Sequence, residues 1–243
     1  PLMSPAGLMP RARAVLVCAL HHTDAMIEIG GEESPHEMGT YCFQYYMNER
    51  LDEISFEMAR FLEGLGYRAL PITASNIWRY REYKELRAIF APDMSHIYAA
   101  VAAGLAELGL SGLALTPDRG PRNRFVSVVT DAPLAPDPLL PGETLCDRCG
   151  QCVRHCCTDA LGKEIRGKVA IEIEGRKYWR LDKNLWRCAW AEHFNLDLRS
   201  ERVRDPQTVD ETTILEELTQ YGTRGHERGV CQKVCVPPHL RTD

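Results

Sequence analysis

A cluster of cysteines in the second half of the chain is the feature that most constrains its fold. The sequence has 10 cysteines, and all but two of them lie from Cys146 onward. The run that begins at Leu145, LCDRCGQCVRHCCTDA, contains the spacing C-x2-C-x2-C-x3-C, which is the bacterial iron–sulfur pattern. A fifth cysteine, Cys157, stands where that pattern has proline. Because a chain of 243 residues does not need disulfide cross-links, we interpret these closely spaced thiols as metal ligands in a reducing compartment.

The spacing also predicts a second cluster. The fourth cysteine of such a run usually ligates the other cluster of a two-cluster module. A reciprocal motif follows at Cys231 and Cys235, although Arg228 stands where its first cysteine would be. The predicted ligands of the first cluster are Cys146, Cys149, Cys152 and Cys235. Those of the second are Cys156 and Cys231, with Cys188 and Cys157 as candidates for the two missing positions.

Several alternatives for these thiols stay open. Cys157 could be a small core residue, because cysteine is commonly buried without binding anything. His226 or His193 could replace a thiol, or the second cluster could hold three irons, [3Fe-4S], instead of four. A zinc site is the alternative for the whole set, but two C-x2-C steps that share a cysteine suit a cube better than one tetrahedral ion. We therefore predict two [4Fe-4S] clusters.

The chain before the cysteines is predicted to be an α/β (α+β) domain. Residues 12–20 form an apolar run of strand length, and further strand candidates are residues 67–72, 113–117 and 124–134. Apolar side chains at helical spacing predict a helix over residues 48–67 that extends upstream, and an alanine-rich helix over 95–109 with Asp93 or Ser95 as its N-cap. This alternation predicts a sheet covered by helices on both faces.

A proline-rich stretch over residues 132–143 is predicted to link two domains, residues 1–142 and 143–243. The second contains the eight clustered cysteines. It is also predicted to contain a β-hairpin over 168–182 that turns at Glu174 and Gly175, and a short helix near 210–222.

Composition excludes some classes of partner. The net charge is -5, with 29 basic and 34 acidic residues, which argues against a nucleic-acid partner. The sequence has no apolar stretch of the roughly 18 residues that a transmembrane helix needs. Together with the reduced thiols, these features predict a cytoplasmic location.

The sequence resembles the superfamily of reductive dehalogenases and epoxyqueuosine reductases. Three parts of the chain carry this resemblance: residues 11–20, residues 102–134 and the cysteine module. The resemblance is greatest over residues 102–134, where the matching positions are Gly104, Gly109, Gly120, Arg124, Thr130, Asp131, Pro133 and Leu134. It implies a nitroreductase-like α/β domain that binds cobalamin, followed by a ferredoxin-like module with two [4Fe-4S] clusters. It further implies that single electrons pass through the clusters to the cobalamin, which reduces an organic substrate of the halogenated or epoxide type. A ferredoxin or flavodoxin-type donor would supply the electrons, and the substrate would be a small molecule.

The same resemblance implies candidate site residues in the first domain. A tyrosine proton donor would fall at Tyr45 or Tyr46. His21 follows the first predicted strand, where ligands of α/β sheets often bind, and Gly120 and Arg122 could approach the cofactor. These three are the candidate cobalamin contacts.

Departures from the family pattern leave a second function open. Leu110 stands where dehalogenases have a basic residue, Arg228 replaces a cluster cysteine, and family members have further sequence before the first strand. The alternative is a non-catalytic electron-transfer or cobalamin-binding protein with two clusters.

Overall fold

The structure is a computed structural model that describes residues 3–28, 41–75, 90, 92–194, 196–204, 207–221 and 230–242. Its first part is built on a three-stranded antiparallel sheet in the order β1-β5-β2. These strands are β1 (Ala14–His21), β5 (Asn123–Thr130) and β2 (Ala69–Ile72). In the register, Thr130 lies opposite both Ala14 and Ala69, so β5 is the central strand.

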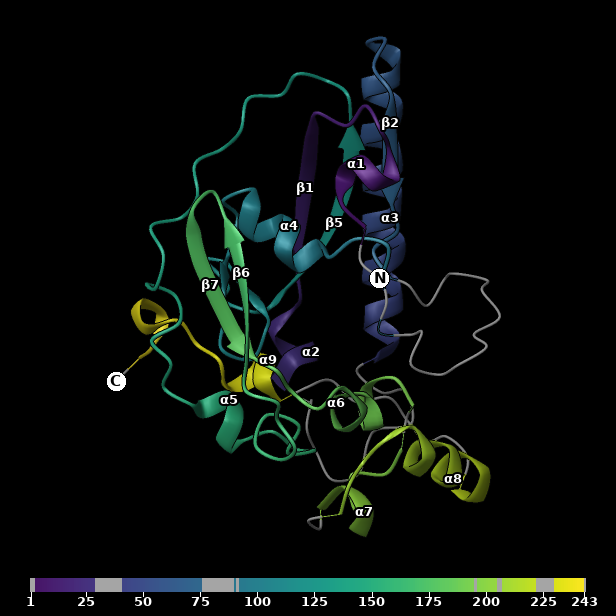
Figure 1. The fold of residues 1–243 in the computed structure, drawn as a ribbon, viewed down its shortest axis with the longest axis vertical. Coiled ribbons are helices and arrows are strands. Elements are labelled where there is room, and N and C mark those ends of the chain that lie inside the picture. The colour runs from purple at the N-terminus through teal and green to yellow at the C-terminus, as the bar shows by residue number, and fades with distance from the viewer. Residues whose placement is uncertain are drawn as a thin grey trace.

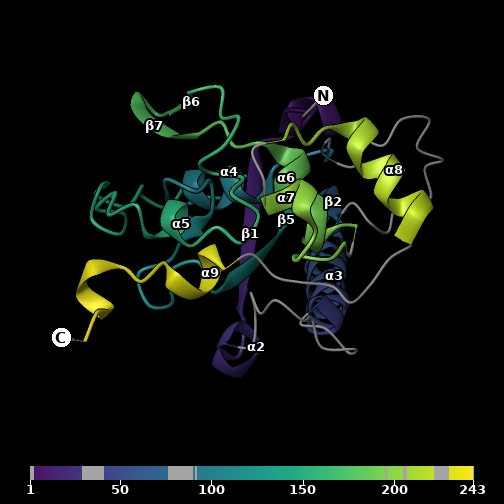
Figure 2. The same ribbon diagram turned by 90° about the horizontal axis from the view of Figure 1, so that it is seen from below.

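Helices cover both faces of this sheet, as the sequence predicts. Val126 and Val128 pack with residues of α3 (Tyr41–Gly64), whereas Phe125 packs with Ala100 of α4 (His96–Ala102). Successive side chains of a strand point to opposite faces, so an uninterrupted apolar strand needs a partner on each side. Figures 1 and 2 show α3 and α4 on opposite sides of the sheet. The predicted mixed α and β fold is confirmed, with an antiparallel sheet.

The long helix α3 has the predicted upstream extension and ends where glycine permits a left-handed residue. Gly66 has φ +90°, and the Tyr67 N–H donates to the Leu62 carbonyl at 3.1 Å. This pattern satisfies carbonyl groups that would otherwise be left free at the helix end.

The helix predicted over residues 95–109 is shorter than expected. Ser95 caps it, since its hydroxyl accepts from the Tyr98 N–H at 3.3 Å, but α4 ends at Ala102. Gly104 then adopts φ +68°, and a Cβ there would meet the Pro138 carbonyl oxygen at 2.2 Å. The chain therefore turns at Gly104, under residues 132–143, and continues into β3 (Glu107–Leu108), which pairs with β4 (Ala114–Leu115). The strand predicted over 113–117 is reduced to β4.

Residues 132–143 contain no helix or strand and lead into the cysteine-rich part. The predicted hairpin is confirmed as β6 (Lys168–Ile173) and β7 (Arg176–Leu181), with Glu174 and Gly175 at φ 50° and 76°. Two consecutive residues of positive φ match the twist of a two-residue hairpin. The hairpin stands beside α4, whereas the helices of this part gather at one end of the molecule (Figure 1).

The cysteine-rich part has its own small core. It is centred on Trp190 of α6 (Leu185–Glu192), which is fully buried. Trp190 packs with Val203 of α7 (Glu201–Arg204) and with Ile214 of α8 (Glu211–Tyr221). The Trp190 indole N–H donates to the Asp197 carbonyl at 2.9 Å, so its polar atom is satisfied. Of the helices in the described ranges, none combines the length and the apolar character that crossing a bilayer requires. The remaining elements are α1 (Pro5–Leu8), α2 (Asp24–Glu28), α5 (Gln151–Arg154), α9 (Cys231–Val234) and the 3-10 helix Pro238–Leu240.

Candidate metal centre

The loop from Cys146 to Cys152 wraps tightly because two of its residues are left-handed. Arg148 has φ 59° and Gly150 has φ 74°, and α5 begins directly after Gly150. A non-glycine residue in this region costs about 1–2 kcal/mol. The Arg148 guanidinium lies 3.6 Å from the centre of the Trp179 ring on β7 and pairs with Glu143 at 2.9 Å, contacts that help to hold it there.

Cys235 joins this loop because α9 packs against α5. Burial, together with the neighbouring thiols of Cys146, Cys152 and Cys149, raises the pKa of the Cys235 thiol to about 12. Burial, followed by Cys146 and Cys149, also raises the pKa of Cys152. The cysteines predicted for the first cluster are therefore close neighbours, although Cys152 and Cys235 lie 83 residues apart in the chain.

Hydrogen-bond donors approach two sulfurs of this first set. The Leu110 N–H donates to Cys146 Sγ at 3.4 Å, and Arg241 Nη2 lies 3.7 Å from Cys149 Sγ. The Arg241 guanidinium also forms a two-point ion pair with Asp147, at 2.6 and 3.0 Å. Cys149 is exposed to solvent. Hydrogen bonds to sulfur and solvent exposure are the main controls on the potential of an iron–sulfur cluster.

The second set of thiols meets at a small cavity where α6 and α9 approach the end of the Cys146–Cys157 run. Asn184 caps α6 by accepting from the Arg187 N–H at 3.0 Å, which fixes the helix that carries Cys188. The Ala160 N–H donates to Cys156 Sγ at 3.2 Å. Each predicted ligand of the second cluster lines this cavity, namely Cys156, Cys157, Cys188 and Cys231, together with Lys183 and Glu192.

The electrostatics of the second set combine deep burial with one cation. Burial raises the pKa of the Cys231 and Cys188 thiols, whereas Lys183 lowers both. The Cys188 thiolate in turn raises the pKa of Lys183 against the effect of burial. The cysteine and lysine side chains that line this cavity are half-buried, because each of them is exposed to the cavity itself. Sequence reasoning missed Lys183, because its only signal was its place directly before the cap of the Cys188 helix.

The donor set suits clusters better than a single ion. Within the described ranges, no three side chains of His, Cys, Asp and Glu converge closely enough to bind one metal ion. In a cubane cluster each thiolate binds a different iron, so the sulfurs surround the cube rather than meet at a point. Two groups of thiols, each drawn from distant segments and backed by N–H donors, fit that requirement.

Of the two histidines considered as extra ligands, His193 is described by the structure and does not line this cavity. His193 packs edge-on against Phe90, with 6.4 Å between ring centroids, and burial lowers its pKa so that it stays neutral. His226 lies outside the described residues, as does Arg228.

The predicted cobalamin contacts are already engaged with other parts of the protein or lie apart. A Cβ on Gly120 would meet Pro237 Cδ at 2.7 Å, so this glycine packs against the segment that follows Cys235. Arg122 pairs with Asp24 at 2.7 Å and Glu28 at 2.8 Å. His21 is exposed at the end of β1. The role of these three residues as cobalamin contacts stays a prediction.

The predicted tyrosine donors both lie on α3. Tyr46 is 68% exposed, and Tyr45 is half-buried. Neither lines the cavity of the second thiol set, and their catalytic role stays a prediction.

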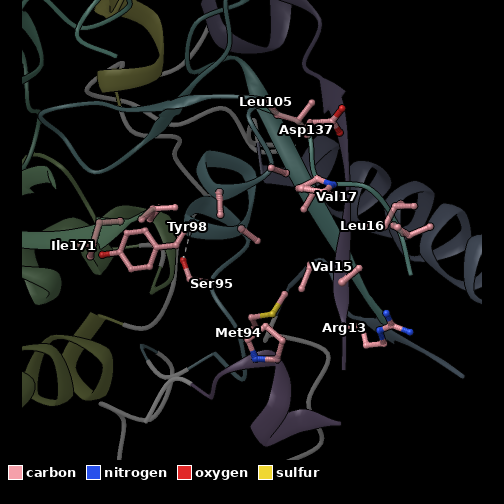
Figure 3. A pocket seen from close by; sticks show the side chains of 18 of the residues that line it. Arg13, Val15, Leu16, Val17, Met94, Ser95, Tyr98, Leu105, Asp137 and Ile171 are labelled. Atoms are coloured by element: carbon pink, nitrogen blue, oxygen red, sulfur yellow. Dashed lines mark hydrogen bonds between the residues drawn. The ribbon is translucent and has the colours of Figure 1, made fainter. Parts of the chain in front are cut away.

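An apolar cavity of about 870 Å³ lies apart from the cysteines. Figure 3 shows it between β1, α4 and the hairpin, with Val15, Val17 and Leu105 along one side and Tyr98 and Ile171 along another. Tyr98 is held by Arg180, whose Nε lies 3.2 Å from the phenol oxygen. No cysteine and no predicted site residue is among those that line it, so sequence reasoning gave no sign of this cavity.

An α/β domain followed by two groups of converging thiols is an arrangement suited to an oxidoreductase. The comparisons confirm the resemblance to the reductive dehalogenases and epoxyqueuosine reductases. The chain is 34% identical over 148 residues to the tetrachloroethene reductive dehalogenase of Desulfitobacterium hafniense, which covers 57% of this chain and 24% of the relative. No family model matches the sequence.

Solved structures agree at the level of the fold. A reductive dehalogenase described with a mechanism for B12-dependent dehalogenation aligns with a TM-score of 0.54 and 19% identity, over 85% of this chain and 28% of the other. Epoxyqueuosine reductase from Streptococcus thermophilus aligns with a TM-score of 0.53 and 15% identity, over 100% of this chain and 53% of the other. The chain thus spans about a quarter of the length of the matched dehalogenases. The relatives and solved structures named here are all described as reductases or reductive dehalogenases.

Proposed function

We propose that this protein is an iron–sulfur oxidoreductase that passes single electrons through two [4Fe-4S] clusters. The first would be held by Cys146, Cys149, Cys152 and Cys235, and the second by Cys156, Cys188, Cys231 and Cys157. The observation that carries the proposal is that eight thiols from three segments gather into two groups. Cys152 lies in α5 and Cys156 follows two residues after its end, so adjacent parts of the chain serve both groups.

The chemistry of thiolate-bound clusters suits this role. They change oxidation state by one electron with little rearrangement, and their potentials extend to low values. The short path along α5 would place the two clusters side by side. A ferredoxin or flavodoxin-type protein would supply the electrons, and a small organic molecule, halogenated or an epoxide, would be reduced.

Cobalamin is the proposed acceptor, on the similarity to a reductive dehalogenase described as B12-dependent. When bound, it would supply a strongly reducing cobalt centre. Of the residues predicted to contact it, Gly120 packs against Pro237 and Arg122 pairs with Asp24. Their contact with cobalamin, like that of His21, stays a prediction.

The test is metal content followed by titration. Protein purified or reconstituted without oxygen should contain about eight irons and eight sulfides per chain, and the reduced form should give EPR signals of two interacting clusters. Added cobalamin should then change its absorption spectrum. Zinc in place of iron, with no sulfide, would disprove the clusters. A cluster-loaded protein that leaves the cobalamin spectrum unchanged would disprove the acceptor.

The second candidate is a non-catalytic electron carrier or cobalamin-binding protein. Leu110 favours it, because its backbone lies beside Cys146 at the position where dehalogenases have a basic side chain. The discriminating measurement is turnover. Reduced protein with cobalamin that consumes a halogenated aromatic or an epoxyqueuosine tRNA is an enzyme, and a protein that is oxidised only by another redox protein is a carrier.

A further inference from the structure

Lys183 is the basic residue that lines the cavity of the second thiol set. Its place is fixed by its neighbour Asn184, whose backbone N–H donates to the Ala160 carbonyl at 3.0 Å and whose side chain caps α6. Lys183 therefore enters the cavity from the same turn that positions Cys188. The sulfurs of Cys188 and Cys231 are its strongest charged neighbours, and Glu192 follows.

The cation at the first thiol set, Arg241, is neutralised by a carboxylate. Arg241 approaches Cys149, but Asp147 holds its guanidinium in a two-point ion pair. The side chains of Arg241 and Asp147 are 40% and 38% exposed. An ion pair in contact with water exerts little net field on its surroundings. Among the described residues Lys183 forms no salt bridge within 4.0 Å, and Glu192 is the carboxylate that lines the same cavity.

We infer that Lys183 is a fixed positive charge that raises the reduction potential of the second cluster. The inference rests on the proposed function, because it requires a cluster at Cys156, Cys188 and Cys231. Reduction adds one negative charge to a cluster, and a nearby cation stabilises the reduced form. The field is strong here because the site is buried and water does not screen it. Glu192, on the last turn of α6, acts in the opposite sense and limits the effect.

Lys183 lines the same cavity as Cys188 and Cys231 and forms a side-chain hydrogen bond with Cys188, so its charge acts directly on the proposed cluster ligands. Its role is to set the potential through the ligands, and it is a positioning residue rather than a catalytic one. The first cluster should be little affected, since its thiols do not share this cavity.

The experiment is a redox titration followed by EPR, on protein reconstituted with iron and sulfide. Lys183→Met keeps the length of the side chain and removes the charge. At a fixed potential we expect the ratio of reduced to oxidised second cluster to fall about tenfold, which is about 59 mV for a one-electron couple. Lys183→Arg should restore the wild-type ratio. Lys163→Met is the matched control, because Lys163 lies in the same module and binds the Arg204 carbonyl and Asp159 outside the cavity.

A second variant tests the inference even if Lys183→Met fails to retain its cluster. Glu192→Gln removes the opposing charge and should raise the potential of the second cluster. Unchanged potentials in both variants, with iron content intact, would overturn the role of Lys183 and leave the two-cluster proposal standing. Wild-type protein that lacks a second cluster would instead overturn the proposed function.

Discussion

At Cys157 a thiol stands in place of the proline of the usual iron–sulfur pattern. The residue lines the cavity with Cys156, Cys188 and Cys231, and it also packs against the core centred on Trp190. A ligand and a core thiol are both compatible with this position. Its ligand role therefore stays a prediction, and iron content decides it.

Cys157→Ala should lower the iron content to about half, or leave a three-iron EPR signal, because a cubane cluster needs four protein ligands. Cys18→Ala is the control, since Cys18 lies in β1 with its sulfur 3.1 Å from that of Met58. Two intact four-iron clusters in Cys157→Ala would show that this thiol is only a core residue.

The ion pair between Glu164 and Arg187 helps to hold α6, the helix that carries Cys188 of the second thiol set. Arg187 is fully buried on α6, with its Nε 2.9 Å from Glu164 Oε2 and its Nη1 2.9 Å from the Val203 carbonyl. Burial is the largest influence on Glu164 and opposes its charged form, but the hydrogen bonds from Arg187, Val209 and Thr208 and the charge of Arg187 together outweigh it and lower the pKa of the carboxyl. The pair links α6 to the loop before the hairpin.

Glu164→Gln should reduce the free energy of unfolding by about 2 kcal/mol at pH 7, because it leaves a buried guanidinium without its charge partner. The pKa of Glu164 is lower in the folded than in the unfolded protein, so its contribution is present above the unfolded value of about 4.3 and is lost as pH falls below it. In urea unfolding, the difference in unfolding free energy between wild type and Glu164→Gln should be smaller at pH 3.5 than at pH 7. Glu143→Gln is the control at the surface and should cost less than about 1 kcal/mol. An equal, pH-independent loss in both variants would contradict this account.

At the scale of elements, the hairpin β6–β7 depends on its turn. Glu174 and Gly175 both have positive φ, and a Cβ on Gly175 would meet no atom within 4 Å. Substitution at Gly175 therefore tests backbone conformation without a steric clash. Trp179 of β7 lies between the cations of Arg148 and Lys168, so the hairpin contacts the first thiol loop.

Gly175→Ala should speed amide hydrogen exchange in the hairpin about tenfold, because a left-handed alanine costs about 1–2 kcal/mol. Gly64→Ala is a matched control: Gly64 ends α3 with an ordinary φ and equally open surroundings. That variant should not accelerate exchange, since alanine is the better helix former. Equal exchange in wild type and Gly175→Ala would mean that the turn does not limit hairpin opening.

Across the whole molecule, the two proposed domains differ in what holds them together. The sheet packs on α3 and α4 through apolar side chains, among them Leu51, Val126 and Phe125. The helices α5 and α9 pack against each other, are four residues long, and each carry one of the thiols. Helices this short have little stability of their own, so bound clusters would be part of the fold there.

Removal of iron with a chelator should therefore increase hydrogen exchange and proteolysis in residues 143–243 and leave the sheet of residues 1–142 protected. The free thiols of Cys231 and Cys235 have raised pKa values because burial disfavours their charged forms, and iron binding would replace their protons. Mass spectrometry of exchange in loaded and iron-free protein makes the comparison. Uniform protection after iron removal would contradict both the domain boundary and the structural role of the clusters.

Local rules predicted much of this fold and failed where a distant segment decides. The hairpin turn at Glu174 and Gly175 and the cap at Ser95 follow from short-range chemistry, and the structure has both. The helix predicted over residues 95–109 is wrong beyond Ala102, because Gly104 turns where Pro138 packs against it. Nothing in the local pattern of residues 102–109 indicates the approach of a segment some 30 residues later.

The cysteine spacing alone predicted the division of the C-x2-C-x2-C-x3-C run and of Cys231 and Cys235 between two groups, because the reach of such a run leaves few ways to arrange them, and it left the places of Cys157 and Cys188 open. The sequence also determined the mixed α and β class, through the periods at which its apolar residues recur. Only the tertiary structure decided what surrounds the thiols. It brought Lys183 and Glu192 to the second group and a neutralised Arg241 to the first, and it engaged Gly120 and Arg122 in contacts of their own. Ligand spacing is a property of a short stretch of chain, whereas the field at a buried site is the sum of charges that packing collects from the whole of it.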